Sequence, residues 1–161
     1  MRKIFCIIIF LTSFSYCYAV DKLPIGSSLD GLEFIKIVVD FNVSSPDMIL
    51  LRLGLLEKTL NDIENNNKKY DVVVAIRGGA VDFMTKTPKY IKSEYVEAHK
   101  KVRKMILLLQ SKGVNFELCA IAAGLRGVEV IDILEEIRVV RNGYLSIIGY
   151  QNRGYAYLPM D

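Results

Sequence analysis

The eight-residue run Phe34–Phe41 (FIKIVVDF) constrains the fold more than any other feature, because it is apolar and β-branched along almost its whole length. A strand with one solvated face alternates apolar and polar residues, whereas a nearly continuous apolar run is typical of a strand covered on both faces. Residues 72–76 (VVVAI) have the same character and end at Arg77, Gly78 and Gly79. These two runs predict a parallel sheet with helices packed on both sides.

The segments that follow these runs predict helices against the sheet. Ser45 as a cap, Pro46 at the first helical position and Asp47 beside it indicate a helix start. The apolar residues after it form one stripe: Ile49, Leu53, Leu56, Leu60 and Ile63. After a short helical turn at residues 80–84, a second helix is predicted over residues 89–112, ending at Gly113. Its predicted buried stripe is Ile91, Tyr95, Ala98, Val102, Met105 and Leu109.

The remaining segments complete an alternating order. Residues 114–119, 137–140 and 155–158 predict strands, and residues 144–152 predict a final helix. Residues 120–127 are interpreted as a loop, and residues 130–135 as a weak helix. Strands that alternate with helices imply right-handed crossovers, and hence a three-layer α/β/α sandwich with a five-stranded parallel sheet.

The N-terminus has the pattern of a secretory signal peptide. Arg2 and Lys3 precede an apolar run over residues 4–14, and Ala19 supplies a small residue at the expected cleavage point. A retained membrane anchor is the less favoured alternative, because a spanning helix needs about 20 apolar residues. We therefore expect a signal peptide at residues 1–19, an exposed lead-in at 20–32 and one domain at 33–161. The protein would be exported to the periplasm without a stable membrane anchor.

Cleavage after residue 19 would change both the charge and the cysteine count. It removes two of the 21 basic residues and none of the 18 acidic ones, leaving a net charge of +1, so no nucleic-acid partner is predicted. Cys6 and Cys17 leave with the signal peptide, and Cys119 remains as the single cysteine. A single thiol in an oxidising compartment is buried, paired between chains or chemically used.

Cys119 is the candidate catalytic residue, because it ends a predicted strand. Its thiolate could act as a nucleophile if Arg77 or Arg126 supplied a nearby cation. The alternative is a small buried apolar side chain. In a parallel sheet the carboxyl ends of the strands form the ligand site. The candidate small-anion-binding residues at these ends are Asn42, Ser44, Arg77, Gly78, Gly79 and Arg126. Simple turn formation by the glycines and simple capping by the serines are the alternatives.

Several other classes of site are disfavoured. His99 is expected to be solvated on the flank of the second helix, and with no second histidine no metal site is predicted. No cofactor is predicted either. The chain has no GxSxG elbow, Walker loop, GxGxxG after the first strand or CxxC pair.

Taken in order, the segments resemble the DsrE/DsrF-like family. GVNFELCAIAAG, IRVV and NGYLSIIGYQNRGYAYL are similar to its C-terminal half, and FIKIVVDFN and DVVVAIRGGAVDFM to its first two strands. The similarity extends over residues 34–158. It implies a five-stranded parallel sheet in a DsrEFH-like sandwich, and assembly as trimers or hexamers. It also implies that Cys119 matches the cysteine on which some members carry sulfur as a persulfide.

The resemblance leaves two functional hypotheses, and it leaves open whether the protein is an enzyme. AIAAGLRG, after the cysteine, is small and apolar where family members often have polar residues. The first hypothesis is a sulfur-relay protein that exchanges sulfur with a donor or acceptor protein through Cys119. The second is a non-catalytic oligomeric module that binds a small anion or a protein. Tyr150, Tyr155 and Tyr157 would then line a subunit interface, or alternatively belong to the core.

Overall fold

The computed structural model describes residues 23–161. The signal-peptide prediction lies outside the described residues, and the boundaries of the lead-in stay a prediction. Residues 23–31 form turns and are mostly exposed, with the Asp30 amide donating to the Ser27 carbonyl at 3.1 Å. All further statements concern residues 32–161.

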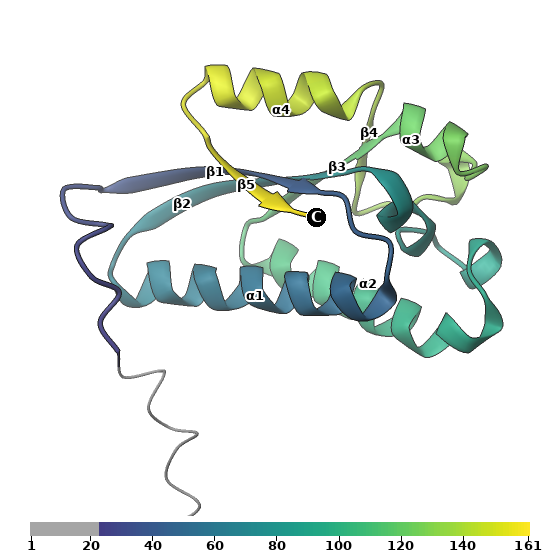
Figure 1. The fold of residues 1–161 in the computed structure, drawn as a ribbon, viewed down its shortest axis with the longest axis horizontal. Coiled ribbons are helices and arrows are strands. Elements are labelled where there is room, and N and C mark those ends of the chain that lie inside the picture. The colour runs from purple at the N-terminus through teal and green to yellow at the C-terminus, as the bar shows by residue number, and fades with distance from the viewer. Residues whose placement is uncertain (1–22) are drawn as a thin grey trace, which may run out of the picture. The chain divides into compact units, whose positions relative to one another are not determined.

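The domain is a three-layer α/β/α sandwich around a five-stranded sheet, which confirms the predicted fold class. The strands are β1 (Phe34–Phe41), β2 (Lys69–Ile76), β3 (Asn115–Cys119), β4 (Arg138–Val140) and β5 (Ala156–Met160). Every strand pair is parallel, and the order is β4-β3-β2-β1-β5. The helices α1 (Pro46–Asn65) and α2 (Val96–Ser111) lie on one face of the sheet, and α4 (Gly143–Asn152) lies on the other (Figure 1). The short helix α3 (Ala120–Leu125) directly follows β3.

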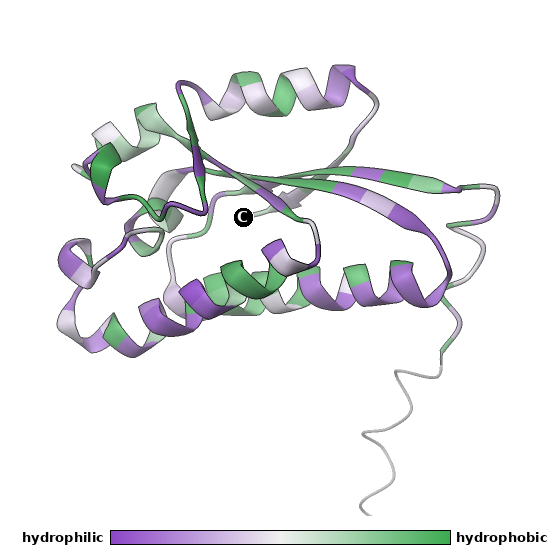
Figure 2. Ribbon diagram, turned by 180° about the vertical axis from the view of Figure 1, so that it is seen from behind, coloured by the Kyte–Doolittle hydropathy of each residue, from purple (hydrophilic) through white to green (hydrophobic). Residues whose placement is uncertain are grey.

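Helix α1 matches its prediction closely. Ser45 is the N-cap and Pro46 the first helical residue, although the Ser45 side chain makes no capping hydrogen bond. All five predicted stripe residues are buried. Figure 2 shows hydrophobic and hydrophilic residues alternating along α1 and α2, as expected for helices with one face on the sheet.

The second helix begins later than predicted. Residues 88–95 form two 3₁₀ turns, Pro88–Tyr90 and Ser93–Tyr95, and α2 starts at Val96. Its buried stripe is His99, Val102, Ile106 and Leu109. The predicted stripe was therefore partly wrong, because Met105 to Leu109 are apolar without a break and do not define a face. His99 is buried, so its predicted solvation was also wrong.

Two short segments also differ from the prediction. Residues 120–125, predicted as loop, form α3, since alanine and leucine are strong helix formers despite Gly124. Residues 130–135, predicted as a weak helix, contain only the 3₁₀ turn Val130–Asp132. The predicted strands all exist, with ends shifted by up to three residues.

The two faces of the sheet differ in chemistry. Successive residues of a strand point to opposite faces. The face toward α1 and α2 is apolar: Ile37, Val39, Phe41, Val72, Val74, Ile76, Phe116 and Leu118. The α4 face has a small apolar centre, where Val38 and Ala75 pack with Ile147 of α4. Around that centre it carries ionisable residues: Lys36, Asp40, Asp71, Glu117 and Arg138.

Candidate functional site at the carboxyl ends of the strands

A cavity of about 400 Å³ lies at the carboxyl ends of β1, β2, β3 and β4. The chain leaves β1 and β2 toward the helices on one face, and leaves β4 toward α4 on the other face (Figure 1). Open α/β sheets bind ligands where the connections diverge in this way. The predicted residues that line the cavity are Asn42, Arg77, Gly78, Gly79, Cys119 and Arg126. Ile121, Ala122, Leu125, Asn142 and Tyr144 also line it and were not predicted.

Cys119 ends β3 and forms part of the cavity wall. The residue is 4% exposed, and its thiol has no hydrogen-bond partner within residues 23–161. The residue is therefore shielded from bulk solvent, yet it borders a space that a small group could occupy.

Arg77, the first predicted cation, is held on two sides. Its guanidinium donates to both carboxylate oxygens of Asp40, at 2.8 and 2.7 Å, and lies 4.3 Å from the ring centroid of Tyr144. Tyr157 donates to the same carboxylate at 2.9 Å. Burial would lower the pKa of Arg77, but the Asp40 carboxylate outweighs it and raises the pKa. Arg77 is thus a permanent cation whose charge Asp40 balances.

Gly143 allows Arg77 and Cys119 to lie next to each other. A Cβ on Gly143 would lie 3.0 Å from Cys119 Cβ and 3.3 Å from Arg77 Cγ. The first contact is at the lower limit of real Cβ contacts, so a larger residue would push the two side chains apart. The sequence marks Gly143 only as punctuation before a helix, and nothing in the pattern shows what it borders.

The two predicted glycines serve the packing of two loops. Gly78 has a φ of +57°, and a Cβ on it would lie 1.9 Å from Asn42 Oδ1. A Cβ on Gly79 would lie 2.4 Å from Ser44 Oγ. Ser44 therefore packs against Gly79 behind the cavity and is absent from its lining. The glycines bring the loop after β1 against the loop after β2, and this contact forms one side of the site.

Arg126, the second predicted cation, is also paired. Its Nε donates to Asp82 Oδ1 at 3.0 Å, and its Nη2 contacts Asp82 Oδ2. Asp82 is buried, and the pairing raises the pKa of Arg126. Both guanidiniums that border the Cys119 cavity are thus neutralised by aspartates.

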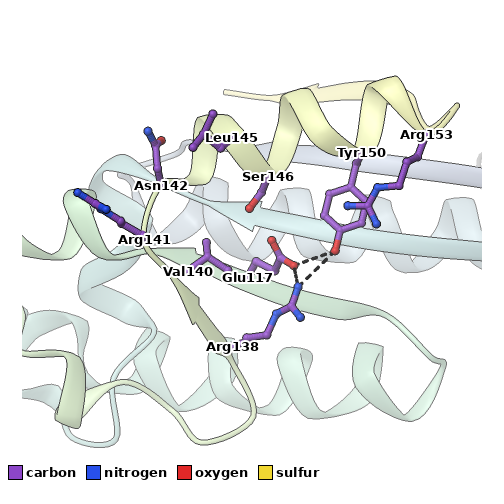
Figure 3. A pocket seen from close by; sticks show the side chains of 9 residues that line it. All are labelled: Glu117, Arg138, Val140, Arg141, Asn142, Leu145, Ser146, Tyr150 and Arg153. Atoms are coloured by element: carbon purple, nitrogen blue, oxygen red, sulfur yellow. Dashed lines mark hydrogen bonds and ion pairs between the residues drawn. The ribbon is translucent and has the colours of Figure 1, made fainter.

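A second pocket, of about 290 Å³, lies between β4 and α4 (Figure 3). At its base Glu117, 3% exposed, accepts from Tyr150 at 2.8 Å and pairs with Arg138. Burial would raise the pKa of Glu117, but hydrogen bonds from Ser146, Arg138 and Tyr150 outweigh it and lower the pKa. Arg141 and Arg153 also line this pocket. Sequence reasoning missed Glu117, because a glutamate between Phe116 and Leu118 indicates the solvated face of a strand.

The three C-terminal tyrosines share one role. Each donates its hydroxyl to a carboxylate on the α4 face of the sheet: Tyr150 to Glu117, Tyr155 to Asp71 and Tyr157 to Asp40. The bond to Asp71 raises the pKa of Tyr155 to about 12. Their hydroxyls therefore attach α4, and the segment that runs from α4 into β5, to carboxylates of β3, β2 and β1.

Residues 23–161 contain no group of three or more histidine, cysteine, aspartate or glutamate side chains placed to hold a metal ion. Among the same residues, no helix combines the length and the apolar character needed to cross a membrane.

The sequence match over most of the chain defines the class of protein. A profile of the DsrE/DsrF-like family matches residues 31–160, and the chain belongs to this family. This result confirms the resemblance found in the sequence.

Individual relatives add the fold and no activity. An uncharacterized protein of Aquifex aeolicus (strain VF5) is 27% identical over 133 residues, which are 78% of this chain and 56% of that protein, so the chain spans about half of its length. The protein of unknown function MTH1491 from Methanobacterium thermoautotrophicum superposes with a TM-score of 0.61 at 22% identity, covering 78% of this chain and 98% of that one. The ychN protein from E. coli superposes with a TM-score of 0.51 at 15% identity, covering 78% and 98%.

Proposed function

We propose that the protein carries sulfane sulfur as a persulfide on Cys119 and passes it to a second thiol. The observation that carries this proposal is the thiol itself, which is almost fully buried but borders a cavity without a protein partner. A persulfide adds one sulfur atom to Sγ, and the cavity has room for it. Membership of the DsrE/DsrF-like family supports the proposal, since the resemblance matches Cys119 to a sulfur-carrying cysteine.

The chemistry needs one thiolate and a donor that holds sulfane sulfur. The Cys119 thiolate attacks the sulfane sulfur, an S–S bond forms at Sγ, and the bond to the donor breaks with its electron pair on the leaving group. Because no second cysteine lies in residues 23–161, Cys119 cannot be resolved as an intramolecular disulfide within this part of the chain. The persulfide therefore persists until an external thiol takes the outer sulfur.

Mass spectrometry of the loaded protein tests the proposal. We expect incubation of the full chain with a sulfane-sulfur donor, either elemental sulfur or thiosulfate, to add about 32 Da per sulfur to the peptide that contains Cys119, reversibly with dithiothreitol. The Cys119→Ser variant is the matched control and gains nothing on this peptide. An unmodified Cys119 peptide under these conditions would contradict the proposal.

A specific surface favours the second candidate, a module that self-associates. On α4, Tyr144, Leu145 and Ile148 are 60%, 64% and 53% exposed, although they belong to a helix that packs on the sheet. Exposed large apolar side chains gathered on one element are typical of interfaces. We expect light scattering to give the mass of an oligomer, and Leu145→Lys to reduce it. Leu51→Lys, at a residue 51% exposed on α1, is the matched control, and a monomer mass for the unmodified chain would remove this candidate.

A further inference from the structure

Two guanidiniums line the cavity around Cys119, and each is paired with an aspartate that lies outside the lining. Arg77 is paired with Asp40, whose side chain is 13% exposed, and Arg126 with the buried Asp82. Within residues 23–161 no other charged side chain lines this cavity. Counted with these two aspartates, the four charges cancel in pairs, so neither guanidinium is an unpaired cation for a dianion.

The remaining walls are largely apolar. Ile121, Ala122 and Leu125 of α3 and the ring of Tyr144 line the same space. Ile121 and Leu125 are exposed, so apolar surface begins at the rim. An anion entering here would lose hydration without gaining an unpaired cation, whereas an apolar ligand would gain from leaving water.

The pocket between β4 and α4 differs from the Cys119 cavity in its charge. Arg138, Arg141 and Arg153 line it against a single carboxylate, that of Glu117. Arg141 has no ion-pair partner among the described residues. Guanidiniums in excess over carboxylates suit oxyanions. The pocket that favours an oxyanion is thus a different pocket from the one that contains the thiol.

We propose that sulfur reaches Cys119 as uncharged sulfane sulfur, of which elemental sulfur is the simplest form, and not as an oxyanion such as thiosulfate. This inference rests on the proposed persulfide function. The Cys119 thiolate attacks one atom of the S₈ ring, the Sγ–S bond forms and one ring S–S bond breaks. The electron pair of that bond stays on the far end of the opened chain, which becomes the terminal anion. No oxidant or reductant is needed.

The test compares two donors at two thiols. The full chain is incubated with elemental sulfur or with thiosulfate at equal sulfane concentration, and the added sulfur is measured on the Cys119 peptide. The reference is a Cys119→Ser, Leu51→Cys variant, whose thiol lies on the exposed side of α1 and reports the intrinsic reactivity of each donor. We expect the ratio of elemental-sulfur to thiosulfate loading to be at least about tenfold higher at Cys119 than at position 51.

Variants that change the charge around the cavity test whether charge balance decides which donor loads Cys119. Asp40→Asn leaves Arg77 unbalanced, and Leu125→Lys adds a cation at the exposed rim without touching the core. Both variants are expected to raise thiosulfate loading several-fold. Asp71→Asn is the matched control, because Asp71 lies on the same face of the sheet but outside the cavity lining.

The outcomes distinguish the neutral-donor inference from the persulfide function. Equal or lower selectivity at Cys119 than at position 51 overturns the neutral-donor inference and leaves the persulfide function standing. Failure of both donors to load Cys119, while position 51 is loaded, overturns the persulfide function itself. Charge variants that leave thiosulfate loading unchanged also overturn the inference, because charge balance would then not decide the donor.

Discussion

Glu117 and Leu118 are neighbours in β3, yet they point into two regions held together by different forces. Leu118 is fully buried on the face covered by α1 and α2, where the residues of the central strands are apolar. Glu117 is almost as buried on the α4 face, where its carboxylate accepts from Tyr150 and pairs with Arg138. Burial alone therefore does not tell which interaction stabilises a layer.

The difference has a definite consequence for stability. Burying a leucine side chain contributes about 1.5–3 kcal/mol at any pH. A hydrogen bond to a charged group contributes about 1.5–3 kcal/mol, but only while the group keeps its charge. The α1/α2 face should thus respond to side-chain volume, and the α4 face to protonation.

Leu118→Ala should have the largest effect, because it opens a space in a fully buried layer. We expect the free energy of unfolding to fall by about 2–5 kcal/mol. Urea titrations at pH 7 and pH 5 should show the same loss, because no titratable group is changed. A loss that depends on pH would break the proposed contrast between the faces.

Glu117→Gln should cost about 1–3 kcal/mol at pH 7, because the amide keeps the shape and loses the charge. The pKa of Glu117 is lowered from 4.5 in the folded protein, so its contribution is complete above pH 4.5 and is lost as pH falls through the folded pKa. Unfolding at pH 7 and at pH 3 measures this, and the gap between variant and unmodified protein should narrow at pH 3. An unchanged gap would show that the charge is not what stabilises this layer.

His99 is a titratable exception on the α2 side. It is buried with Nε2 donating to the Thr85 carbonyl at 2.9 Å, and burial lowers its pKa below 6.5. Stability is therefore full above pH 6.5 and declines as pH falls toward the folded pKa, since the unfolded chain binds the proton first. We expect the free energy of unfolding to be lower at pH 5 than at pH 7. The His99→Gln variant should show a flatter profile, and an equal slope in both proteins would assign the loss to other groups.

Tyr157→Phe should have the smallest effect. Its hydroxyl donates to Asp40 at the exposed β5 edge, where water can replace it. We expect a cost of about 0.5 kcal/mol, measured by thermal unfolding beside Tyr150→Phe, whose acceptor is buried. If Tyr157→Phe cost more than Tyr150→Phe, the ordering of buried over exposed hydrogen bonds on this face would be wrong.

The sequence was sufficient for the layers, because continuous apolar strands and the α1 stripe leave few other ways to bury their side chains. It was also sufficient to predict that most strand-end residues lie close together, since parallel strands all end at one edge of the sheet. It failed at Ala120–Leu125, where small residues suggested a loop, and at His99, where unbroken apolar residues hid the face of α2. Glu117 could not be found either, because its partners Tyr150 and Arg138 lie 33 and 21 residues away.

The pairing of β1 with β5 determines when this domain can be completed. Residues 37–41 are in register with Ala156–Met160, and the Asn42 amide donates to the Met160 carbonyl at 3.1 Å. The first strand of the domain therefore keeps one open edge until its last strand is present. A chain that stops before residue 156 would expose that edge to other nascent chains, which makes premature termination a direct route to aggregation.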